Sequence, residues 1–575
     1  MESRERFYAP PPPDEVINAL SKYHTLVRDI LFSRGVSTES DADAFLNPDF
    51  NTQVHDPFLL TDMRVAVERI LQAIIKQEHI VIYTDYDCDG IPGGVLLHDF
   101  FTEIGYAQFE NYIPHRHEEG YGFNAESVAL FQARNATLII TVDCGITDHE
   151  AVNRAKEAGI DVIVTDHHEV GGGGVPSAYA VINPKRDNAY PFSGICGTAV
   201  AFKLVQALIS VGRDRGLIHL KEGCEKWWLD LVGIATIADM VPLVDENRVF
   251  AHYGLLVLRK TRRLGLHHLL RKAGTLSKHI TEDDIGFTIA PRINAASRMD
   301  DPEDAFHMLR ARSDEDAGMY VAHLEKLNNE RKGVVAHMTK EAKARLASLE
   351  SIPPVVVLGN PQWRPSLVGL VANALAEEYE RPVFVWGRDG KGVIKGSCRS
   401  GGGASVVRLM EISSDAFLGF GGHHASGGFS VDHEQIHTLA DILCENFLKY
   451  MDDTDDSSSR QLHIDARITL EDITDTYVNA LNQLAPFGVG NPRPLFEITN
   501  ATPYAVEIFG KAKNHTKLRF RFGGSFMDGI AFFTMPDDFS VMPQTGVPLT
   551  LIAHIEDSYF MGRKEIRLRI VDVVI

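Results

Sequence analysis

The segment that decides the fold is Tyr83-Thr84-Asp85-Tyr86-Asp87-Cys88-Asp89-Gly90, which follows the apolar run His79-Ile80-Val81-Ile82. Three carboxylates at alternate positions concentrate more negative charge than a packing motif tolerates, and they indicate a cation site. An EF-hand calcium loop opens with the same spacing, but Leu96 stands where its bidentate glutamate should be. A strand ending in acidic residues is instead typical of an α/β domain, where ligands gather at the carboxyl ends of parallel strands.

Three further apolar runs also end in side chains that bind metals. Residues 138–142 precede Asp143-Cys144-Gly145, residues 161–165 precede Asp166-His167-His168, and residues 231–238 precede Asp239. Between the first two runs, residues 148–158 have a helical pattern with Gly159 as a C-cap, which predicts a βαβ unit. We expect four strands, including residues 231–238, whose polar ends meet at one edge of a sheet.

Carboxylates and imidazoles without cysteine pairs at zinc spacing favour Mn²⁺ or Mg²⁺ over structural zinc. Five or six such ligands are more than one ion requires from the protein. The sequence therefore predicts a two-metal site that activates water against a phosphoester. For any one of these residues, a helix N-cap or a satisfied core histidine is the simpler interpretation, and only their combination in one domain favours a metal site.

These residues resemble the four motifs of the DHH phosphoesterase superfamily. The motifs are Asp85-Tyr86-Asp87-Cys88-Asp89-Gly90, Asp143-Cys144-Gly145, Asp166-His167-His168 and Ile237-Ala238-Asp239-Met240-Val241-Pro242-Leu243. Within the superfamily, the chain is similar to the RecJ family of single-stranded-DNA-specific 5′→3′ exonucleases. That likeness continues in order through residues 291–299, 396–400, 421–423 and 486–492, and so covers nearly the whole chain.

The resemblance implies a role for each motif residue. It assigns metal binding and catalysis to one set of acids and an imidazole, namely Asp87, Asp89, Asp143, His167 and Asp239. Asp143 is expected to bridge two ions, and His168 to be either a further catalytic ligand or a group that orients one. Asp85 is left outside the set because family members ligate through the last two acids of this motif. Substrate binding is assigned to His115, Arg116, Arg298, Ser397, Arg399 and His423.

The implied fold class is α/β: two α/β domains (DHH and DHHA1) joined by a long helix and followed by an all-β, OB-like domain. The expected parts are an N-terminal leader (1–55), the DHH catalytic domain (56–313), a connecting helix (314–350), the DHHA1 substrate-binding domain (351–450), an acidic linker (451–460) and the OB-like nucleic-acid-binding domain (461–575). In the leader, apolar spacing predicts one amphipathic helix over residues 14–31 and another around residues 41–46.

Two further patterns concern nucleic-acid binding. The glycine-rich segments 392–400 and 419–428 resemble parts of the DHHA1 domain, and we expect them to be loops whose backbone amides cradle phosphate. Residues 517–522 and 565–570 alternate basic and apolar side chains, which predicts strands with arginines on one face. The arginines on that face either only increase solubility or, in an OB-like barrel, bind along a single nucleic-acid strand.

Composition limits the class of protein. No stretch of eighteen apolar residues is present, which argues against a membrane span, and no apolar segment follows the first residues, which argues against secretion. The six cysteines are scattered, as expected for a reducing cytoplasm. The net charge of −21 argues against a protein that coats nucleic acid, so binding must rely on local basic tracks.

The function we expect is metal-dependent 5′→3′ hydrolysis of single-stranded DNA to 5′-mononucleotides in DNA repair and recombination. The resemblance further implies a monomer, with a single-stranded-DNA-binding protein and a helicase as partners. The alternatives are a DHH/DHHA1 phosphodiesterase of short oligonucleotides or cyclic dinucleotides, a non-catalytic DNA-binding scaffold and an inorganic pyrophosphatase. The chain departs from the family at Arg364-Pro365-Ser366, where a His-x-Gly segment is usual, so substrate contacts there are open.

Overall fold

The computed structural model describes residues 6–275, 277–453, 462–510, 513–522, 524–560 and 563–574. They form two compact units, the larger within residues 50–459 and the smaller from the described parts of residues 1–49 and 460–575. Of the acidic linker predicted at residues 451–460, the beginning belongs to helix α19 (Leu439–Asp453), and the rest lies outside the described residues.

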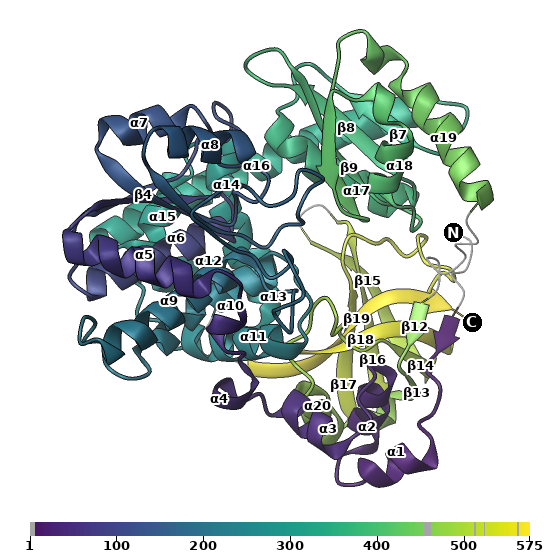
Figure 1. Cartoon of the computed structure of the whole chain (residues 1–575). Coiled ribbons are helices and arrows are strands. Elements are labelled where there is room, and N and C mark those ends of the chain that lie inside the picture. Colours follow the sequence, from purple (N-terminus) through teal and green to yellow (C-terminus); the bar gives the residue numbers. More distant parts are fainter. Residues whose placement is uncertain are drawn as a thin grey trace. The chain divides into compact units, whose positions relative to one another are not determined.

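The larger unit contains a parallel sheet, of which Figure 1 labels β4, and its strand order is β3-β2-β4-β5-β6. Its strands are β2 (His79–Thr84), β3 (Phe109–Tyr112), β4 (Ala136–Val142), β5 (Asp161–Thr165) and β6 (Ala180–Ile182). The first three predicted runs are therefore confirmed as strands. Because β2, β4 and β5 are adjacent and parallel, their acidic carboxyl ends lie side by side.

Helices cover both faces of this sheet. One apolar core joins alternate residues of β2 and β4 to α5 (Met63–Lys76), α6 (Gly90–Glu103) and α9 (Gly197–Asp214). The intervening residues pack on the other face against α7 (Ser127–Ala133) and α8 (His149–Glu157). Gly159, with a φ of 76°, follows α8 as predicted, so the βαβ unit is confirmed. Both faces are buried, as continuous apolar strands require.

The fourth predicted strand is wrong. Residues 231–238 belong to a helix, α10 (Leu229–Ala238), and Asp239 is the C-cap of that helix. Almost every residue of α10 is buried, so its sequence has no polar face to reveal the helical period. It packs tightly against α11 (Asp245–Leu258), where a Cβ on Gly254 would lie 2.5 Å from the Gly233 Cα.

Helix α4 (Phe50–Gln53) precedes this sheet in the chain. Further helices lead from the sheet into a second one: α12 (Leu264–Ala273), α13 (Glu282–Asp284), the π-helix Ile285–Ile289, α14 (Ala290–Met299), α15 (Glu303–Arg310) and α16 (Asp314–Ala347). The last of these is a single helix of 34 residues, which packs on α12, α14 and α15 near its start and on α17 (Pro365–Tyr379) further along.

The second sheet has the strand order β10-β11-β9-β8-β7. Its strands are β7 (Val356–Gly359), β8 (Val383–Arg388), β9 (Ile394–Arg399), β10 (Gly419–Gly422) and β11 (Ser426–Val431), with α17, α18 (Val406–Ile412) and α19 packed around them. The glycine-rich segments predicted as loops are therefore mainly antiparallel strands. In β9, a Cβ on Gly396 would lie 2.1 Å from the Phe429 ring, so glycine serves close strand packing there.

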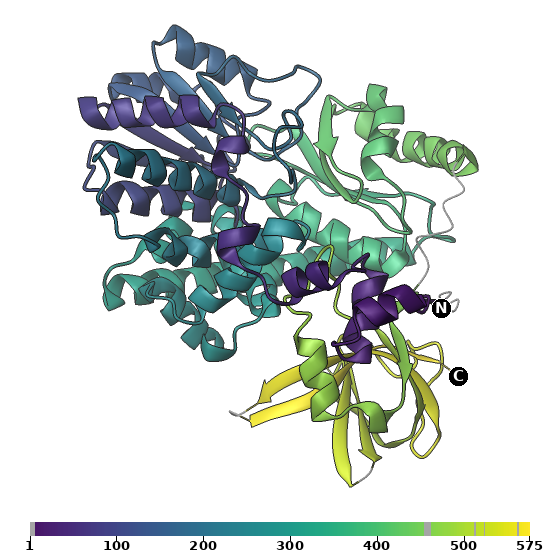
Figure 2. The ribbon, with the colours of Figure 1, turned by 60° about the horizontal axis from the view of Figure 1, so that its bottom comes forward.

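The smaller unit joins the two ends of the chain (Figure 2). Its seven-stranded sheet contains β13 (Ala466–Ile468), β14 (Phe496–Ala501), β15 (Pro503–Phe509), β16 (His515–Phe522), β17 (Ser525–Ala531), β18 (Leu549–Phe560) and β19 (Arg563–Val574). The all-β prediction missed one helix, α20 (Asp475–Asn482). A separate parallel pair joins β1 (Arg6–Tyr8) to β12 (Leu462–Ile464).

The described part of the predicted leader belongs to this unit up to residue 49, and the predicted first helix is divided. Residues 14–31 form α1 (Asp14–Ala19) and the greater part of α2 (Thr25–Ser33), and α3 (Glu39–Leu46) follows. The division is explained by the His24 side chain, which accepts a hydrogen bond from the Leu26 N–H (3.2 Å) and caps α2. Apolar residues of these helices share one core with the seven-stranded sheet.

Within the described parts of the chain, every helix is too short or too polar to cross a lipid bilayer.

The close contact between α10 and α11 generates a stability prediction. We expect Gly254→Ala to lower the free energy of unfolding by about 1–3 kcal/mol, because the new methyl group meets backbone atoms that cannot rotate away. Gly333→Ala, in the middle of α16 with nothing near the added methyl, should raise it by about 0.5–1 kcal/mol. Urea denaturation of both variants measures the difference, and equal effects would contradict the proposed backbone contact.

Candidate metal centre and phosphate cavity

Three acidic residues continue the ends of adjacent parallel strands. The backbone N–H group of each donates to a carbonyl of the neighbouring strand: Asp85 to Val142 (3.1 Å), Asp143 to Thr165 (2.9 Å) and Asp166 to Ile182 (3.1 Å). These bonds extend the sheet by one residue and hold the three carboxylates at one level. Asp143 then takes a φ of 63°, which turns the chain out of the strand.

The rest of the first motif is a tight turn into α6. The Asp87 carboxylate accepts hydrogen bonds from the backbone N–H groups of Asp89 (2.8 Å) and Gly90 (3.2 Å). A Cβ at Gly90 would lie 2.4 Å from the Asp85 carbonyl oxygen, so only glycine allows the turn to close this tightly. The turn brings the second carboxylate of the motif, Asp87, back towards the first, Asp85.

Asp89 is fixed by a second helix. Its carboxylate accepts hydrogen bonds from the backbone N–H groups of Gly197 (2.6 Å) and Thr198 (2.7 Å), the first residues of α9. The N-terminal amides of a helix have no partners within the helix and carry partial positive charge, so they favour a carboxylate there. Gly197 also packs against Asp143, whose Oδ1 would lie 2.5 Å from an added Cβ.

Asp166 orients the two histidines that follow it. One oxygen accepts from the backbone N–H groups of His167 (2.7 Å) and His168 (3.1 Å), and also lies 2.8 Å from His168 Nδ1. The other accepts from the backbone N–H of Ile146 (2.9 Å). Burial alone would lower the pKa of His168, but the hydrogen bond to Asp166 raises it to about 9.

His167 lies among carboxylates from different parts of the chain. Its Nε2 is 3.2 Å from Asp143, 3.6 Å from Asp89 and 3.6 Å from Asp239. Burial lowers the pKa of His167 to about 4, so the ring is a neutral imidazole at pH 7, the form that ligates metals. Asp239 thus reaches the site although it follows a helix and not a strand.

The side chains form three overlapping groups of potential metal ligands. Within each group the ligand atoms lie within 4.8 Å of one another: Asp85, Asp87 and Asp143; Asp143, His167 and His168; Asp89, His167 and Asp239. Asp143 and His167 each occur in two groups. A residue that bridges two ions must belong to two groups, so the position of Asp143 is compatible with its predicted role. Asp85, left outside the predicted ligand set, is brought together with the other two acids.

The electrostatics of these groups fit a divalent cation. Burial first, and neighbouring carboxylates second, raise the pKa of Asp85, Asp143 and Asp239, the last to about 9. Within the described chain, the buried Oδ1 atoms of Asp85 and Asp143 accept no hydrogen bond. Buried acceptors without donors, and acids that repel one another, raise the free energy of the folded state unless a cation is bound. Carboxylate oxygens and imidazole nitrogens are ligands that suit Mn²⁺ or Mg²⁺.

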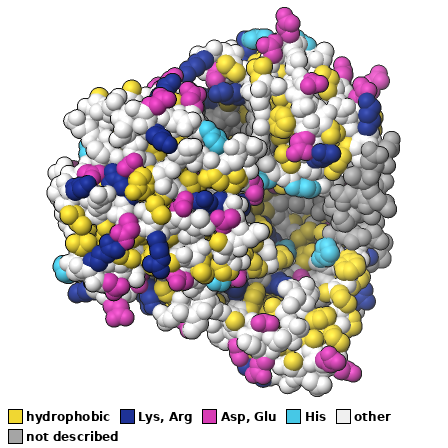
Figure 3. Space-filling view, in the orientation of Figure 1, with side chains coloured by type: hydrophobic (Ala, Val, Ile, Leu, Met, Phe, Trp, Pro, Cys, Tyr) yellow, Lys and Arg dark blue, Asp and Glu magenta, His cyan; other side chains and the backbone are white. Residues whose placement is uncertain are grey.

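A cavity of about 580 Å³ borders the metal-ligand groups. On one side it is lined by Tyr86, between two of the acids, and by Tyr121, whose hydroxyl lies 3.3 Å from the His168 ring. The opposite wall comes from the second α/β domain. The basic residues that line the cavity are Arg116, Arg364, Arg388 and Lys395. Figure 3 shows the surface hollowed between these two domains, with basic side chains at the rim.

The predicted substrate-binding arginines lie close enough to repel one another. Arg298 is half-buried, and desolvation together with the charges of Arg116, Arg331 and Arg399 lowers its pKa to about 9. Its guanidinium donates to the Ser366 carbonyl (2.7 Å), and among the described residues it has no carboxylate partner. Such uncompensated positive charge is stabilised by an anion, and phosphate suits arginine best.

The other predicted substrate residues differ in position. Ser397 and Arg399 lie on one face of β9 and both face Gly369 of α17, where an added Cβ would lie 3.2 Å from the Arg399 guanidinium. His423 is exposed just after β10. His115 does not line the 580 Å³ cavity, where His117 is found instead.

The predicted arginine face of the smaller unit is largely balanced by acids. Its ion pairs are Lys517–Asp528 (2.5 Å), Arg519–Glu507 (3.6 Å), Arg567–Glu556 (3.1 Å) and Arg569–Glu556 (3.5 Å). Nearby, Arg521 lies over the ring of Phe526, an exposed side chain that also contacts exposed Tyr504. Charge alone therefore does not make this face a nucleic-acid track, but aromatic side chains able to stack on bases are present.

Four residues important to the site were not predicted from the sequence. Thr198 and Gly197 hold Asp89, Asp166 orients the histidines, and the Asn294 side chain accepts from the Cys88 N–H (2.9 Å). Asp166 lies in the motif Asp166-His167-His168 and Asn294 in the segment 291–299, so membership of a motif could have indicated their importance. The contact from α9 joins segments more than a hundred positions apart and has no local signal.

Three segments match known domain families. Residues 79–236 match the DHH family, N-terminal domain; residues 353–449 match the DHHA1 domain; and residues 464–572 match the RecJ OB domain. The order of the matches is that of the predicted domains.

The chain is also similar to known proteins along nearly all of its own length. The chain is 35% identical over 570 residues to the single-stranded-DNA-specific exonuclease RecJ of Bacillus subtilis (strain 168), covering 98% of this chain and 70% of that protein. It is 31% identical to the protein of the same name from Dickeya dadantii (strain 3937), covering 95% of each. Among solved structures, RecJ of Thermus thermophilus in complex with Mn²⁺ matches with a TM-score of 0.81 and 26% identity, covering 100% of this chain and 80% of that chain.

The raised pKa values generate a pH prediction for metal-free protein. Asp239, with a pKa raised from 3.8 to about 9, and His168, raised from 6.5 to about 9, hold protons in the folded state that the unfolded state has released. Stability then falls as pH rises from 6.5 to 9, because the folded state binds more protons in this interval. We expect the Tm of EDTA-treated protein to fall over this interval and Mn²⁺ to reduce the fall.

Asp239→Asn is the matched variant for this measurement. The substitution removes one of the titrating groups. Among the described contacts, the Asp239 carboxylate accepts no hydrogen bond from a backbone amide, so the variant should still fold. The Tm of the EDTA-treated variant should depend less steeply on pH than that of the unaltered protein. Parallel curves for the two proteins would contradict the assignment of the raised pKa to Asp239.

Proposed function

The chain belongs to the RecJ family, and from this premise we propose that it is a metal-dependent hydrolase that degrades single-stranded DNA as an exonuclease. The observation that carries the proposal is the meeting, within one compact unit, of two features. A cluster of carboxylates and histidines suited to divalent ions borders a cavity lined by arginines suited to phosphate. A phosphodiesterase requires these two features side by side.

We propose Mn²⁺ or Mg²⁺ as the cofactor, with two ions held by Asp87, Asp89, Asp143, His167 and Asp239, and with Asp85 as a further ligand. When bound, such ions lower the pKa of water and neutralise charge on the phosphoryl oxygens. The chain's own contribution is geometric: the α9 amides hold Asp89, and Asp166 orients His168. The similar structure of Thermus thermophilus RecJ is a complex with Mn²⁺, which supports the choice of metal.

We propose that the arginines supply direction. Arg116, Arg298 and Arg399 would bind the terminal 5′ phosphate and so place the first phosphodiester at the metal ions, giving 5′→3′ removal of 5′-mononucleotides. Support comes from the lowered pKa of Arg298, which reflects burial beside other arginines without a carboxylate partner among the described residues. Tyr121, which is exposed, offers a ring on which a base can stack, and we propose that the cavity between the domains admits a single strand but no duplex.

Arg364 modifies this proposal. It lines the cavity at the position where the family resemblance leads us to expect a histidine. A guanidinium is always charged and bidentate, whereas an imidazole is mostly neutral at pH 7. We therefore propose that Arg364 adds a phosphate contact further along the strand.

The rival functions are less well supported. A phosphodiesterase of short oligonucleotides or cyclic dinucleotides has no need of the region at residues 464–572, which matches the RecJ OB domain. A non-catalytic scaffold has no need of the carboxylate cluster. We retain as predictions a role in DNA repair and recombination, a cytoplasmic monomer, and a single-stranded-DNA-binding protein and a helicase as partners.

The test of the main proposal uses an oligonucleotide labelled at its 3′ end, with Mn²⁺. We expect a descending ladder from the single strand and none from the blunt duplex. Asp239→Ala should lower the rate by at least about a hundredfold, because mutation of residues that only contact the metal ligands already lowers activity by up to about that factor. The circular dichroism spectrum should stay unchanged. Cleavage of a dinucleotide with no cleavage of the longer strand would instead favour the short-substrate enzyme.

The arginine anchor is tested by the 5′ end of the substrate. Arg116→Gln should lower the rate about tenfold on a 5′-phosphorylated strand and leave the rate on a 5′-hydroxyl strand nearly unchanged, because one charge-assisted contact is lost. Arg154→Gln is the control, since Arg154 is exposed on α8 and pairs only with Glu150 among the described residues. Equal losses on both substrates would refute a terminal-phosphate role for Arg116.

A further inference from the structure

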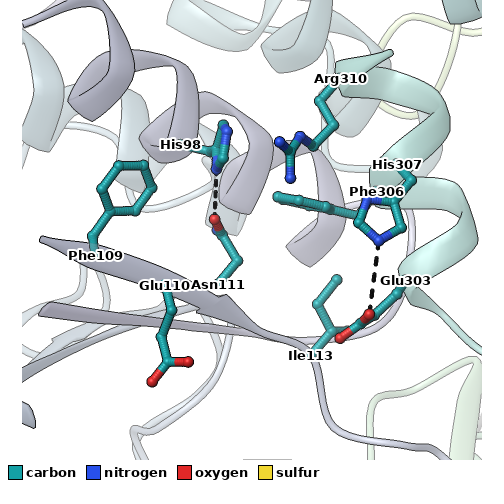
Figure 4. A pocket seen from close by; sticks show the side chains of 9 residues that line it. All are labelled: His98, Phe109, Glu110, Asn111, Ile113, Glu303, Phe306, His307 and Arg310. Carbon is teal, nitrogen blue, oxygen red and sulfur yellow. Dashed lines mark hydrogen bonds and ion pairs between the residues drawn. The ribbon is translucent and has the colours of Figure 1, made fainter. Parts of the chain in front are cut away.

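A second cavity, of about 220 Å³, shares no lining residue with the metal cluster or the arginine-lined cavity. Figure 4 shows it between α6, the edge strand β3 and α15, which contribute His98, Phe109, Asn111, Phe306 and Arg310. All these elements belong to the first α/β domain. Pockets for drug-sized ligands span about 300–1,000 Å³, so this one suits a smaller molecule of one ring system.

Arg310 gives the cavity its charge. Its guanidinium points into the space between His98 and Phe306 and lies 5.6 Å from the centre of the Phe306 ring (Figure 4). Among the described residues, none accepts a hydrogen bond from Arg310 or forms an ion pair with it. Five N–H donors and one positive charge are thus available to a ligand.

The acids around the cavity do not neutralise Arg310. Glu303 pairs with His307 (3.8 Å), as Figure 4 shows, and Glu110 pairs with Arg134 (2.6 Å). In Figure 4 the Glu110 side chain points away from Arg310. Among the described residues, Arg310 is therefore the charged side chain of the lining that has no ion-pair partner, and a ligand that pairs with it must carry an anionic group.

The hydrogen bonding of His98 can be assigned. Asn111 donates through its Nδ2 to the Gly94 carbonyl (3.3 Å), which turns its Oδ1 towards His98 Nδ1 (2.7 Å). Nδ1 must then carry the proton and donate. Burial lowers the pKa of His98, so the ring is neutral and its Nε2 is an acceptor.

The apolar walls are flat rings. The His98 ring centre lies 5.2 Å from that of Phe109 and 5.6 Å from that of Phe306, both in edge-on arrangements. Ile113 closes the floor. A planar ring can pack against these surfaces while its anionic group reaches Arg310 and an N–H donor of the ring reaches His98 Nε2.

We propose that this cavity binds a small planar anion, an acidic group carried on an aromatic ring. Two sources have this chemistry: a nucleoside 5′-monophosphate, with its base as the ring, and an aromatic carboxylate. The nucleotide source rests on the proposed function, because the exonuclease would release such molecules. Binding of a planar anion as such does not depend on that function.

The test is calorimetric titration of EDTA-treated, full-length protein with dAMP, with benzoate and with inorganic phosphate. We expect dAMP to occupy two sites, one weakened about tenfold in Arg116→Gln and the other weakened at least about tenfold in Arg310→Gln, as removal of one charged contact predicts. Single-strand cleavage by Arg310→Gln should equal that of the unaltered protein. Phe306→Leu, which keeps apolar volume but removes the ring, is the second variant and should weaken the same site.

The outcomes separate the two sources and the two proposals. Benzoate binding that Arg310→Gln abolishes, without dAMP binding there, supports the cavity and excludes the nucleotide. Unchanged binding of both ring ligands in Arg310→Gln and in Phe306→Leu would overturn the inference, as would phosphate binding as tightly as either ring ligand. Absence of strand cleavage by the unaltered protein would instead overturn the proposed function and leave the cavity measurement standing.

Discussion

The repulsion between buried carboxylates at the carboxyl edge of the first sheet is the constraint on which the rest of the structure depends. Parallel strands bring Asp85, Asp143 and Asp166 to one level, and the fold must compensate their charge. It does so in two ways: the α9 amides and the backbone around the histidines satisfy Asp89 and Asp166, while Asp85 and Asp143 keep free oxygens. The unsatisfied oxygens define where the cation belongs, and the satisfied acids define what keeps the site rigid.

Much of this centre could be predicted from the sequence because strands have a simple local code. Apolar runs that end in acids or histidines identified β2, β4 and β5, and parallel pairing brings such ends together without further information. The run before Asp239 failed for a physical reason: α10 is buried on all sides, so its residues show neither the helical nor the strand period. Asp239 still reaches the cluster, although its secondary structure was wrongly predicted.

The parts that escaped prediction are contacts between distant segments. Alternation predicted the arginines of β16 and β19 correctly, but their acidic partners are set by strand register: Asp528 lies opposite Arg519, and Glu556 opposite Arg567. No local pattern reveals that pairing. Conversely, the net charge of −21 suggested poor affinity for nucleic acid, yet Arg116, Arg331 and Arg399 lie close enough to Arg298 to lower its pKa. The local arrangement of charges, and not the total charge, sets the binding potential of such a cavity.

The union of both chain ends in the smaller unit has a consequence for synthesis on the ribosome. Helices α1 to α3 emerge first, but the sheet that covers their apolar side chains, including Val27, Ile30 and Leu31, begins only beyond residue 461. At typical elongation rates the delay is on the order of tens of seconds. The larger unit can fold during this interval, whereas helices α1 to α3 cannot bury their apolar side chains until the strands of their sheet have been made. Within the smaller unit, the order of synthesis and the order of packing therefore differ.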